Sequence, residues 1–593
     1  MKLVGRVRKV IFSSPTFSVL LVAAGLENVV VTSPVPLEVG EEAEFKGEFV
    51  THERFGLQFK AEEVKPLSGI EASLLKVKGV STATWKKLKQ AYGWRLSSIL
   101  KGDPYRIAFE LKGFGFKKID AIASELGVNK RARDEAATKW VLTSFFENGH
   151  TCMPQKEFEE EIKKLSAEVA EDLIKTVDGF VTTKEMYETE RKLARLLLSF
   201  KYTNGWWNSE SFLVKLKEFV HQQQFPFSSD QLGAFSCLSY PVSILTGGPG
   251  TGKTTLLKFF VKFLKENNLN VVIAAPTGKA ARRLEEVTGA RAYTIHKLLL
   301  QLTPQATDVL IVDETSMLSS ELALKLLESL KKPSQIIFVG DPDQLPSIDP
   351  GNVLEDLIKS EVFPHWHLSS AHRFKNDSIT QAAECVLSGK WPRGIKFIQL
   401  EPDQLPAVLN TITSEWQVLS PMRRGKTGTS RINSLLQKRF TNATYSFGNT
   451  KFGIGDRVIW TKNDYKLMLL NGQIGKVVNV KPLVVKFEDL EEPVKIPEDK
   501  LFMLELAWAI SVHKAQGSQF KKVLIPIFTE HYIMLSKRLI YTAITRAEEE
   551  CVFVGQKKAL MMGINRKDQH KRYTLLKKFL KEFDKPFNFL SAK

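Results

Sequence analysis

The segment with the most specific chemistry is Gly247-Gly248-Pro249-Gly250-Thr251-Gly252-Lys253-Thr254-Thr255. It follows an apolar run at 242–245 and precedes a helical pattern at 256–260, so we predict a loop between a strand and a helix. Glycines let backbone N–H groups curve around an anion, and the helix N-terminus adds partial positive charge. Lys253 can reach the β- and γ-phosphates, and the Thr254 hydroxyl can hold Mg²⁺. These residues predict a nucleoside triphosphate site but do not say what its energy drives.

Two carboxylates follow the apolar run at 309–312 further along the chain. Asp313 at the end of a buried strand can bind Mg²⁺ through water, and Glu314 can orient and activate the attacking water. An Asp-Glu pair can also arise as a helix cap. Its place downstream of a phosphate loop, in an alternating strand and helix pattern, favours the catalytic interpretation.

Three further side chains suit chemistry on the γ-phosphate. Gln344, in a segment that follows the buried run at 336–339, is a neutral polar group for sensing that phosphate, although the same segment is good β-turn sequence. An arginine from a facing domain can stabilise charge that builds up on the γ-phosphate oxygens. Arg546, in Thr-Ala-Ile-Thr-Arg-Ala, is the first candidate and Arg373 is the second.

A second set of residues suits a nucleic-acid backbone. Junctions between strands and helices, with Thr, Lys and His, can bind phosphodiesters without reading base sequence. Taken singly, each of these segments is also explained by helix capping and surface charge. The candidates are Pro276, Thr277, Lys279, Thr294, His296, His513, Lys514 and Gln516.

Composition narrows the classes of protein. Lys and Arg number 84 against 66 for Asp and Glu, a formal charge of +18, which favours a polyanionic partner as much as a generic basic surface. The four cysteines are far apart, which excludes a disulfide framework and predicts buried thiols in a reducing cytosol. No apolar run reaches the ~18 residues of a membrane span, and the N-terminus is charged where a signal peptide would be apolar. We therefore expect a cytoplasmic protein without a membrane partner.

The length of 593 residues exceeds a single core, so several domains must position these side chains. Short alternating runs predict a small β barrel at 1–66, and helical patterns follow at 67–224. Glycine turns at 77–81 and 111–116 indicate two helix-hairpin-helix units that bind DNA, with a plain helix–helix turn as the alternative. Unbroken apolar runs predict parallel-sheet domains at 225–365 and 366–593, the second with a β insertion at about 440–500 and a basic tail.

In this order, the motifs resemble the RecD-like branch of superfamily 1 helicases over about 225–556. They are the phosphate loop, Val-Asp-Glu-Thr-Ser-Met, Gly-Asp-Pro-Asp-Gln-Leu-Pro, Val-His-Lys-Ala-Gln-Gly-Ser and Thr-Ala-Ile-Thr-Arg-Ala. The resemblance implies a multidomain α/β fold with two RecA-like P-loop domains. It also implies ATP and Mg²⁺ as cofactors, 5′-to-3′ translocation on single-stranded DNA, and duplex unwinding in replication, repair or recombination. Gln231 in Ser229-Asp230-Gln231 is carried over as the adenine contact.

The N-terminal part resembles the extension of the long, stand-alone members of that branch. Phe55-Gly56-Leu57-Gln58-Phe59-Lys60 and Asn148-Gly149-His150-Thr151 are similar to it. This implies an oligonucleotide-binding-type (OB-like) barrel with helix-hairpin-helix units, and an SH3-like form for the β insertion. The implied partners are single-stranded and tailed duplex DNA, together with unidentified replication or repair proteins.

Two positions depart from the family pattern. The interval at 298–308 is short where relatives carry a strand-splitting β-hairpin, and Phe374 stands where Gln is frequent. The short interval keeps open a single-stranded DNA translocase that displaces proteins but separates strands weakly. A P-loop kinase or regulatory ATPase, and a passive DNA-binding module, are the remaining alternatives.

Overall fold

A computed structural model describes most of the chain, which divides into two compact units. The first unit is Met1–Phe145 with Met153–Lys184, and the second is Phe146–Cys152 with Glu185–Lys593. The predicted domain boundaries stay predictions. The described residues are all of 1–593 except 15–16, 26, 53–55, 68, 76, 78–79, 94, 112, 301–306, 331–333, 370–377, 442, 448–449, 465, 489, 567–570 and 592–593, with backbone alone at 69–70, 73, 447 and 586–591.

The first unit begins with the predicted barrel, whose five strands close in the order β1-β2-β3-β5-β4. Pairing is antiparallel except between β3 and β5, and β4 returns to β1. Alternating residues point inward, and Val22, Phe45 and Phe59 are fully buried. The strands are β1 (Lys2–Ser14), β2 (Phe17–Ala24), β3 (Glu27–Ser33), β4 (Glu42–His52) and β5 (Gly56–Pro66).

Helices complete the first unit and share its apolar core with the barrel. Buried Lys89 donates to Glu71 at 3.0 Å and to Glu41 at 2.6 Å, which ties α2 to the barrel. Gly113, with φ of +92°, lies in the turn between α4 and α5, as the second predicted hairpin requires. The elements are α1 (Gly69–Leu74), α2 (Thr82–Tyr92), α3 (Arg95–Gly102), α4 (Arg106–Glu110), α5 (Phe116–Glu125), α6 (Lys130–Phe146), α7 (Gln155–Lys164), and the small sheet β6 (Met153–Pro154), β8 (Phe180–Thr183) and β7 (Ile174–Val177).

The second unit contains two parallel-sheet lobes, and lobe 1 has the strand order β11-β10-β12-β13-β9-β14. Each described pairing in this sheet is parallel, and β9, β10, β12 and β13 are buried along their whole length. That burial explains the unbroken apolar runs in the sequence. Its elements are α10 (Ser229–Ala234), β9 (Val242–Gly247), α11 (Lys253–Glu266), β10 (Val271–Ala275), α12 (Gly278–Thr288), β11 (Ala292–Thr294), α13 (Ile295–Leu300), β12 (Val309–Val312), α14 (Ser320–Glu328), β13 (Gln335–Gly340), α15 (Val353–Ser360) and β14 (His365–Leu368).

Lobe 2 is a second parallel sheet, with the order β15-β26-β25-β16-β24, and it carries the predicted insertion as an antiparallel sheet, β22-β21-β20-β19-β23. The lobe comprises α16 (Ser378–Leu387), β15 (Lys396–Gln399), α17 (Leu405–Leu409), β16 (Trp416–Ser420), α18 (Thr429–Phe440), β24 (Ala509–Ser511), β25 (Phe520–Ile527), α19 (Lys537–Ile544), β26 (Ala547–Gly555) and α20 (Lys557–Asn565). The insertion comprises the hairpin β17 (Ala443–Phe447) and β18 (Thr450–Gly453), then β19 (Arg457–Trp460), β20 (Ile474–Val480), β21 (Leu483–Phe487), β22 (Val494–Lys495) and β23 (Leu504–Leu506).

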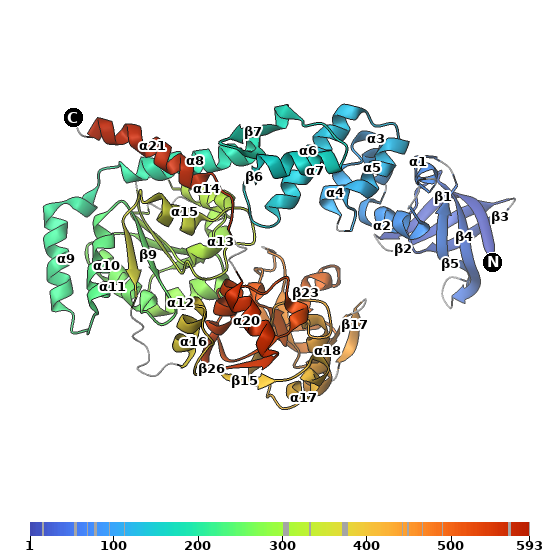
Figure 1. Cartoon of the computed structure of the whole chain (residues 1–593). Helices are drawn as coiled ribbons and strands as arrows, with labels where there is room; N and C mark the ends of the chain where they lie inside the picture. Colours follow the sequence, from blue (N-terminus) through green and yellow to red (C-terminus); the bar gives the residue numbers. More distant parts are fainter. Residues whose placement is uncertain are drawn as a thin grey trace. The chain divides into compact units, whose positions relative to one another are not determined.

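The end of the basic tail packs on helices associated with lobe 1, although lobe 2 precedes it in the sequence. Helix α21 (Leu576–Ser591), red in Figure 1, packs on α15 and on α8 (Lys184–Lys201), where Phe579 meets Tyr187 edge-on at 5.3 Å. Fully buried Glu190 of α8 accepts from Ser320 at 3.0 Å and from the Thr151 hydroxyl and Leu575 N–H at 2.8 Å each. Burial raises the pKa of this carboxyl. Lobe 1 is thus completed by segments from both sides of it in the sequence; α9 (Glu210–Gln222) also covers it.

The predicted fold class is confirmed: a barrel, a helical hairpin region, two parallel-sheet lobes and a β insertion follow one another. The prediction of four buried cysteines is wrong for Cys385, which is partly exposed on α16, while the other three thiols are buried. Among the described residues, no helix has both the length and the apolarity needed to cross a membrane.

Candidate active site and nucleic-acid groove

The phosphate loop joins β9 to α11, as predicted. Gly252 caps α11 with φ of +87°, and a Cβ there would approach the Gln231 amide nitrogen to 2.5 Å, so the position requires glycine. Lys253 points back across the loop and donates to the Gly248 carbonyl oxygen at 2.7 Å. Residues 248–255 line a cleft of about 860 Å³ at the carboxyl ends of the lobe 1 strands. Backbone N–H groups, a cation and a helix N-terminus therefore converge on one polar space.

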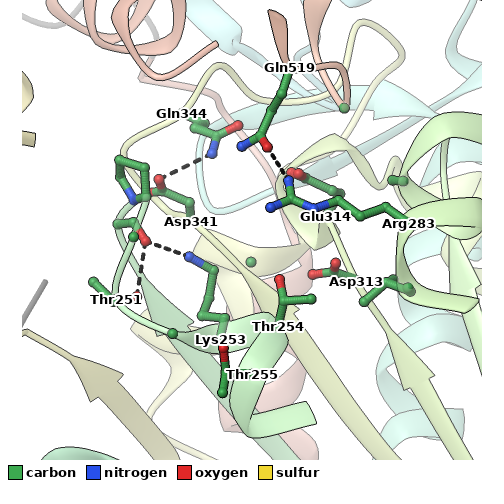
Figure 2. A pocket seen from close by; sticks show the side chains of 18 of the residues that line it. Thr251, Lys253, Thr254, Thr255, Arg283, Asp313, Glu314, Asp341, Gln344 and Gln519 are labelled. Atoms are coloured by element: carbon green, nitrogen blue, oxygen red, sulfur yellow. Dashed lines mark hydrogen bonds between the residues drawn. The ribbon is translucent and has the colours of Figure 1, made fainter. Parts of the chain in front are cut away.

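Asp313 and Glu314 follow β12 on the opposite wall of this cleft. In Figure 2 the Thr254 hydroxyl and the Asp313 carboxylate point toward one another. Burial, and then the neighbouring Glu314 carboxylate, raise the pKa of Asp313 to about 7. A bound divalent cation would offset the cost of burying these two acids, and paired hydroxyl and carboxylate oxygens are ligands that Mg²⁺ accepts. Glu314 adopts a left-handed φ of +50°, a strained conformation of the kind that clusters at functional sites.

A hydrogen-bonded chain joins the two lobes at the edge of the cleft. Gln344 donates to Asp341 of lobe 1 at 3.1 Å and accepts from Arg546 of lobe 2 at 2.9 Å. Tyr541 donates to the same Asp341 carboxylate at 2.8 Å. Arg546 lines the cleft with an exposed fraction of 3%, and its Nε–H has no hydrogen-bond partner among the described residues. The guanidinium therefore retains donor capacity beside the phosphate loop.

Gln231 lies behind the phosphate loop rather than in the wall of the cleft. Its amide nitrogen donates to the Thr251 carbonyl at 3.2 Å, and its amide oxygen accepts from the Ser228 backbone N–H in a capping box. Gln231 thus supports the loop from α10. Its contact with adenine stays a prediction, as do the catalytic roles above. Arg373 lies outside the described residues.

A second groove brings lobe 1, lobe 2 and the insertion together. Five of the predicted nucleic-acid contacts line it, namely Thr277, Lys279, His513, Lys514 and Gln516. Asn471 and Gly472 of the insertion also line this groove, as does Ile348 of lobe 1 with an exposed fraction of 66%. The groove offers half-buried cations and short polar side chains, which suits a backbone that is bound without sequence readout.

Some predicted contacts in this groove are already engaged. Lys279 donates to the Gln519 carbonyl at 3.0 Å, and buried Gln516 donates to the Leu345 carbonyl at 2.7 Å, so both link the lobes. Pro276, Thr294 and His296 are not among the groove residues; the Thr294 hydroxyl instead caps α13 by accepting from Lys297 N–H at 3.1 Å. The expectation of a short pin falls mainly on 301–306, outside the described residues.

Two residues in or beside the cleft, Arg283 and Tyr541, were missed from the sequence. Arg283 of α12 enters the cleft and donates to the Gln519 side chain of lobe 2, as Figure 2 shows. Its charge and that of Lys253 lower the pKa of Asp313 against the effect of burial. Tyr541 binds Asp341 as described. Each lies in or beside a recognised motif but has an unremarkable residue type, and only the fold shows that it faces the cleft.

Comparison with known families finds four matches along the chain. A profile described as "ATP-dependent DNA helicase YrrC, OB-fold domain" matches residues 1–68, and "ATP-dependent RecD2 DNA helicase HHH domain" matches 72–152. An AAA domain matches 227–419, and a UvrD-like helicase C-terminal domain matches 506–554. These ranges cover the barrel, the hairpin helices, lobe 1 with the first part of lobe 2, and the end of lobe 2.

Two curated proteins and one solved structure are similar to this chain over more than half of its length. The ATP-dependent RecD2 DNA helicase of Deinococcus radiodurans is 31% identical over 85% of this chain and 72% of its own length. The RecBCD enzyme subunit RecD of Mycolicibacterium smegmatis is 30% identical over 60% of this chain and 75% of its own length. A crystal structure of Bacteroides Pif1 bound to single-stranded DNA covers 62% of this chain and 98% of its own, at 18% identity and a TM-score of 0.39.

Proposed function

This chain belongs to the ATP-dependent RecD2 DNA helicases, and from that membership we propose a motor that moves 5′ to 3′ on single-stranded DNA and unwinds tailed duplexes. The observation that carries the proposal is the bridge from Asp341 through Gln344 to Arg546. It joins the lobes beside the phosphate loop, at the start of the segment that also reaches the groove. A change at the γ-phosphate can therefore alter both the lobe interface and the DNA path.

Each cleft residue has a distinct task in the proposed hydrolysis. The loop N–H groups and Lys253 bind the β- and γ-phosphates, and Thr254 and Asp313 hold Mg²⁺, which neutralises charge on the phosphate oxygens when bound. Glu314 orients the attacking water and accepts its proton. Arg546 stabilises charge that develops on the γ-phosphate. Gln344 exchanges its present partners for the nucleotide and so reports its state.

The groove supplies the second half of the motor. Thr277 and His513 come from different lobes and line the same groove, so a strand bound there spans the lobe boundary. Closure of the lobes on ATP and reopening after hydrolysis would move the DNA contacts of one lobe relative to those of the other. The positive formal charge of +18 favours such a polyanion. The proposed partners are single-stranded and tailed duplex DNA, and the proposed location is the cytoplasm.

Family membership excludes the P-loop kinase and the passive DNA-binding module. It also favours an unwinding enzyme over a translocase that separates strands weakly, because the 31% identical relative is an ATP-dependent DNA helicase. The motifs that this chain shares with such enzymes include both the hydrolytic residues and the groove residues, so the ATPase and the DNA track belong to one machine.

Strand displacement on three substrates tests the proposal. A duplex with a 5′ single-stranded tail should unwind with ATP and Mg²⁺, while 3′-tailed and blunt duplexes should not. Preference for the 3′ tail would refute the direction. DNA-stimulated ATP hydrolysis without unwinding of any substrate would refute the helicase in favour of the translocase. Lys253→Ala should be inactive on all three, which excludes a contaminating helicase.

A further inference from the structure

Arg572, between α20 and α21, holds a loop of lobe 1 although it follows lobe 2 in the sequence. Its guanidinium donates to the Ser347 hydroxyl at 3.0 Å, to the Gly351 carbonyl at 2.5 Å and to the Asp349 carbonyl at 3.3 Å. A further bond goes to the Ser347 carbonyl. All four acceptors belong to residues 347–351. One side chain therefore contacts the loop at its start, its middle and its end.

The backbone beneath the guanidinium is fitted to it. Gly149 has φ of +85°, and a Cβ built there would lie 2.1 Å from the Arg572 Cζ atom. The Gly149 carbonyl accepts from Gly351 N–H at 3.0 Å, so Gly149 binds the same loop. His150 stacks on Tyr573 at 5.3 Å and accepts from Tyr573 N–H at 3.1 Å. The Asn-Gly-His-Thr segment identified in the sequence thus packs against Arg572 and its neighbour Tyr573.

The loop at 347–351 lies between the two functional spaces. It continues directly from the segment whose Asp341 and Gln344 line the nucleotide cleft. Its own Ile348 lines the groove that holds His513 and Lys514. The charge of Arg572 contributes, after burial, to the lowered pKa of His513, so the guanidinium lies within electrostatic range of the groove. Residues 277–283 and 516–519 also line both spaces, but 344–348 is the segment that carries the proposed γ-phosphate sensor Gln344.

We propose that Arg572 is a positioning residue that holds residues 347–351 so that DNA in the groove sets the alignment of Gln344 in the cleft. The inference rests on the proposed function, since it requires that DNA binds in this groove. Without Arg572, the loop would lose four hydrogen bonds, and DNA contact would no longer be transmitted to the γ-phosphate sensor. Nucleotide binding and basal hydrolysis do not require this support, because the phosphate loop and β12 are formed independently of it.

The residue type fits the task. A guanidinium offers donors in a rigid planar fork, which can bridge several carbonyl oxygens at once. A lysine keeps the charge but presents a compact ammonium that cannot span the same acceptors. Burial lowers the pKa of Arg572 to about 10, so the group remains cationic at neutral pH. We therefore expect Arg572→Lys to recover only part of the coupling.

The test compares ATP hydrolysis with and without single-stranded DNA in the full-length protein. Arg572→Ala should leave the DNA-free rate within about twofold and reduce DNA stimulation about tenfold, within the range of coupling changes seen for residues off both sites. Arg566→Ala is the matched control. Arg566 also donates to three backbone carbonyls, those of Tyr532, Ile533 and Leu535, but at a loop that does not line the groove. DNA stimulation of ATP hydrolysis in Arg566→Ala should equal that of the wild type.

Gly149→Ala tests the same contact without removing the arginine. The added methyl should displace the guanidinium and reproduce the loss of stimulation. Gly389→Ala controls for backbone strain, because Gly389 has φ of +74° and open space where its Cβ would lie. Equal stimulation in Arg572→Ala and wild type would overturn the inference, as would a parallel loss of DNA-free hydrolysis and thermal stability. A wild type without DNA stimulation would instead refute the proposed function.

Discussion

The nucleotide cleft and the nucleic-acid groove lie on two sides of one segment, residues 340–351, yet they are built differently. The cleft takes most of its charged groups from three short segments that each follow a buried strand of lobe 1, with Arg283 from α12 and Arg546 from lobe 2. The groove takes its lining residues from both lobes and from the insertion. Local sequence therefore specifies the cleft, while only the assembled unit specifies the groove.

The charged groups of the two spaces also differ in how far they are buried. In the cleft, burial raises the pKa of Asp313 to about 7, and charges there depend on one another. In the groove, Lys514 is one-third exposed and pairs with Glu505 at 2.9 Å, so solvent moderates its charge. Changes in the cleft should alter the chemical step, and changes in the groove should alter DNA affinity. Four variants test that separation.

The largest effect should come from Lys253→Ala. Loss of the ammonium that reaches the β- and γ-phosphates should reduce ATP hydrolysis below about one per cent of the wild-type rate. Lys258→Ala, an exposed position on the same helix, should hydrolyse ATP normally. Hydrolysis at the wild-type rate in Lys253→Ala would show that the cleft is not the ATPase site.

Arg546→Ala should lower kcat about 10³-fold with DNA present, because the cation that stabilises the γ-phosphate charge is lost. The KM for ATP should change less than about threefold, since this contact strengthens in the transition state. Steady-state kinetics measure both values, and thermal unfolding checks that this buried position still folds. A raised KM with an unchanged kcat would place Arg546 in ground-state binding instead.

Lys514→Ala should weaken single-stranded DNA binding about tenfold at low salt while DNA-free hydrolysis stays unchanged. The slope of log affinity against log salt should fall in magnitude by about one, as expected for one lost phosphate contact. Fluorescence anisotropy across a salt series measures it. Lys522→Ala is the control, because Lys522 has similar exposure and its own glutamate partner at 3.5 Å but lies outside the groove. An unchanged slope would remove Lys514 from the DNA path.

The smallest effect should come from His513→Ala. Burial, and then Arg572, lower the pKa of His513 from its ordinary 6.5, so the imidazole is neutral at pH 7 and above. Its loss should cost about fivefold in DNA affinity, the value of one hydrogen bond, with no change in salt slope. That fivefold difference should be constant between pH 7 and pH 8. A difference that grows toward lower pH within that window would show a charged contact.

The sequence predicted the cleft well because its chemistry is local. A glycine loop after an apolar run, and carboxylates after another, follow from strand and helix periodicity alone, and the structure has both arrangements. Arg283 and Tyr541 were missed because helix residues carry no mark of the direction they face. Gln231 has the predicted neighbourhood, yet its amide is bonded to the loop, which spacing could not reveal.

The sequence predicted only part of the groove, because much of it is assembled by long-range packing. Thr277 and His513 were identified from separate segments, but Ile348 and the insertion residues join them only through long-range packing. The tail was given no chemistry because its basic, helical pattern is common, and its partners lie hundreds of residues away, as in the bond from Leu575 N–H to Glu190. Contacts of such separation leave no periodic signal.

The burial of Glu190 has a consequence for synthesis on the ribosome. This carboxylate needs a donor from Leu575, so the nascent chain exposes its acceptor long before the segment that satisfies it has been translated. The sheet of lobe 1 can form early, but the faces of α8 and α15 that α21 covers stay open to chaperones until translation reaches that helix. The first motor lobe to emerge from the ribosome is thus among the last parts of the molecule to be finished.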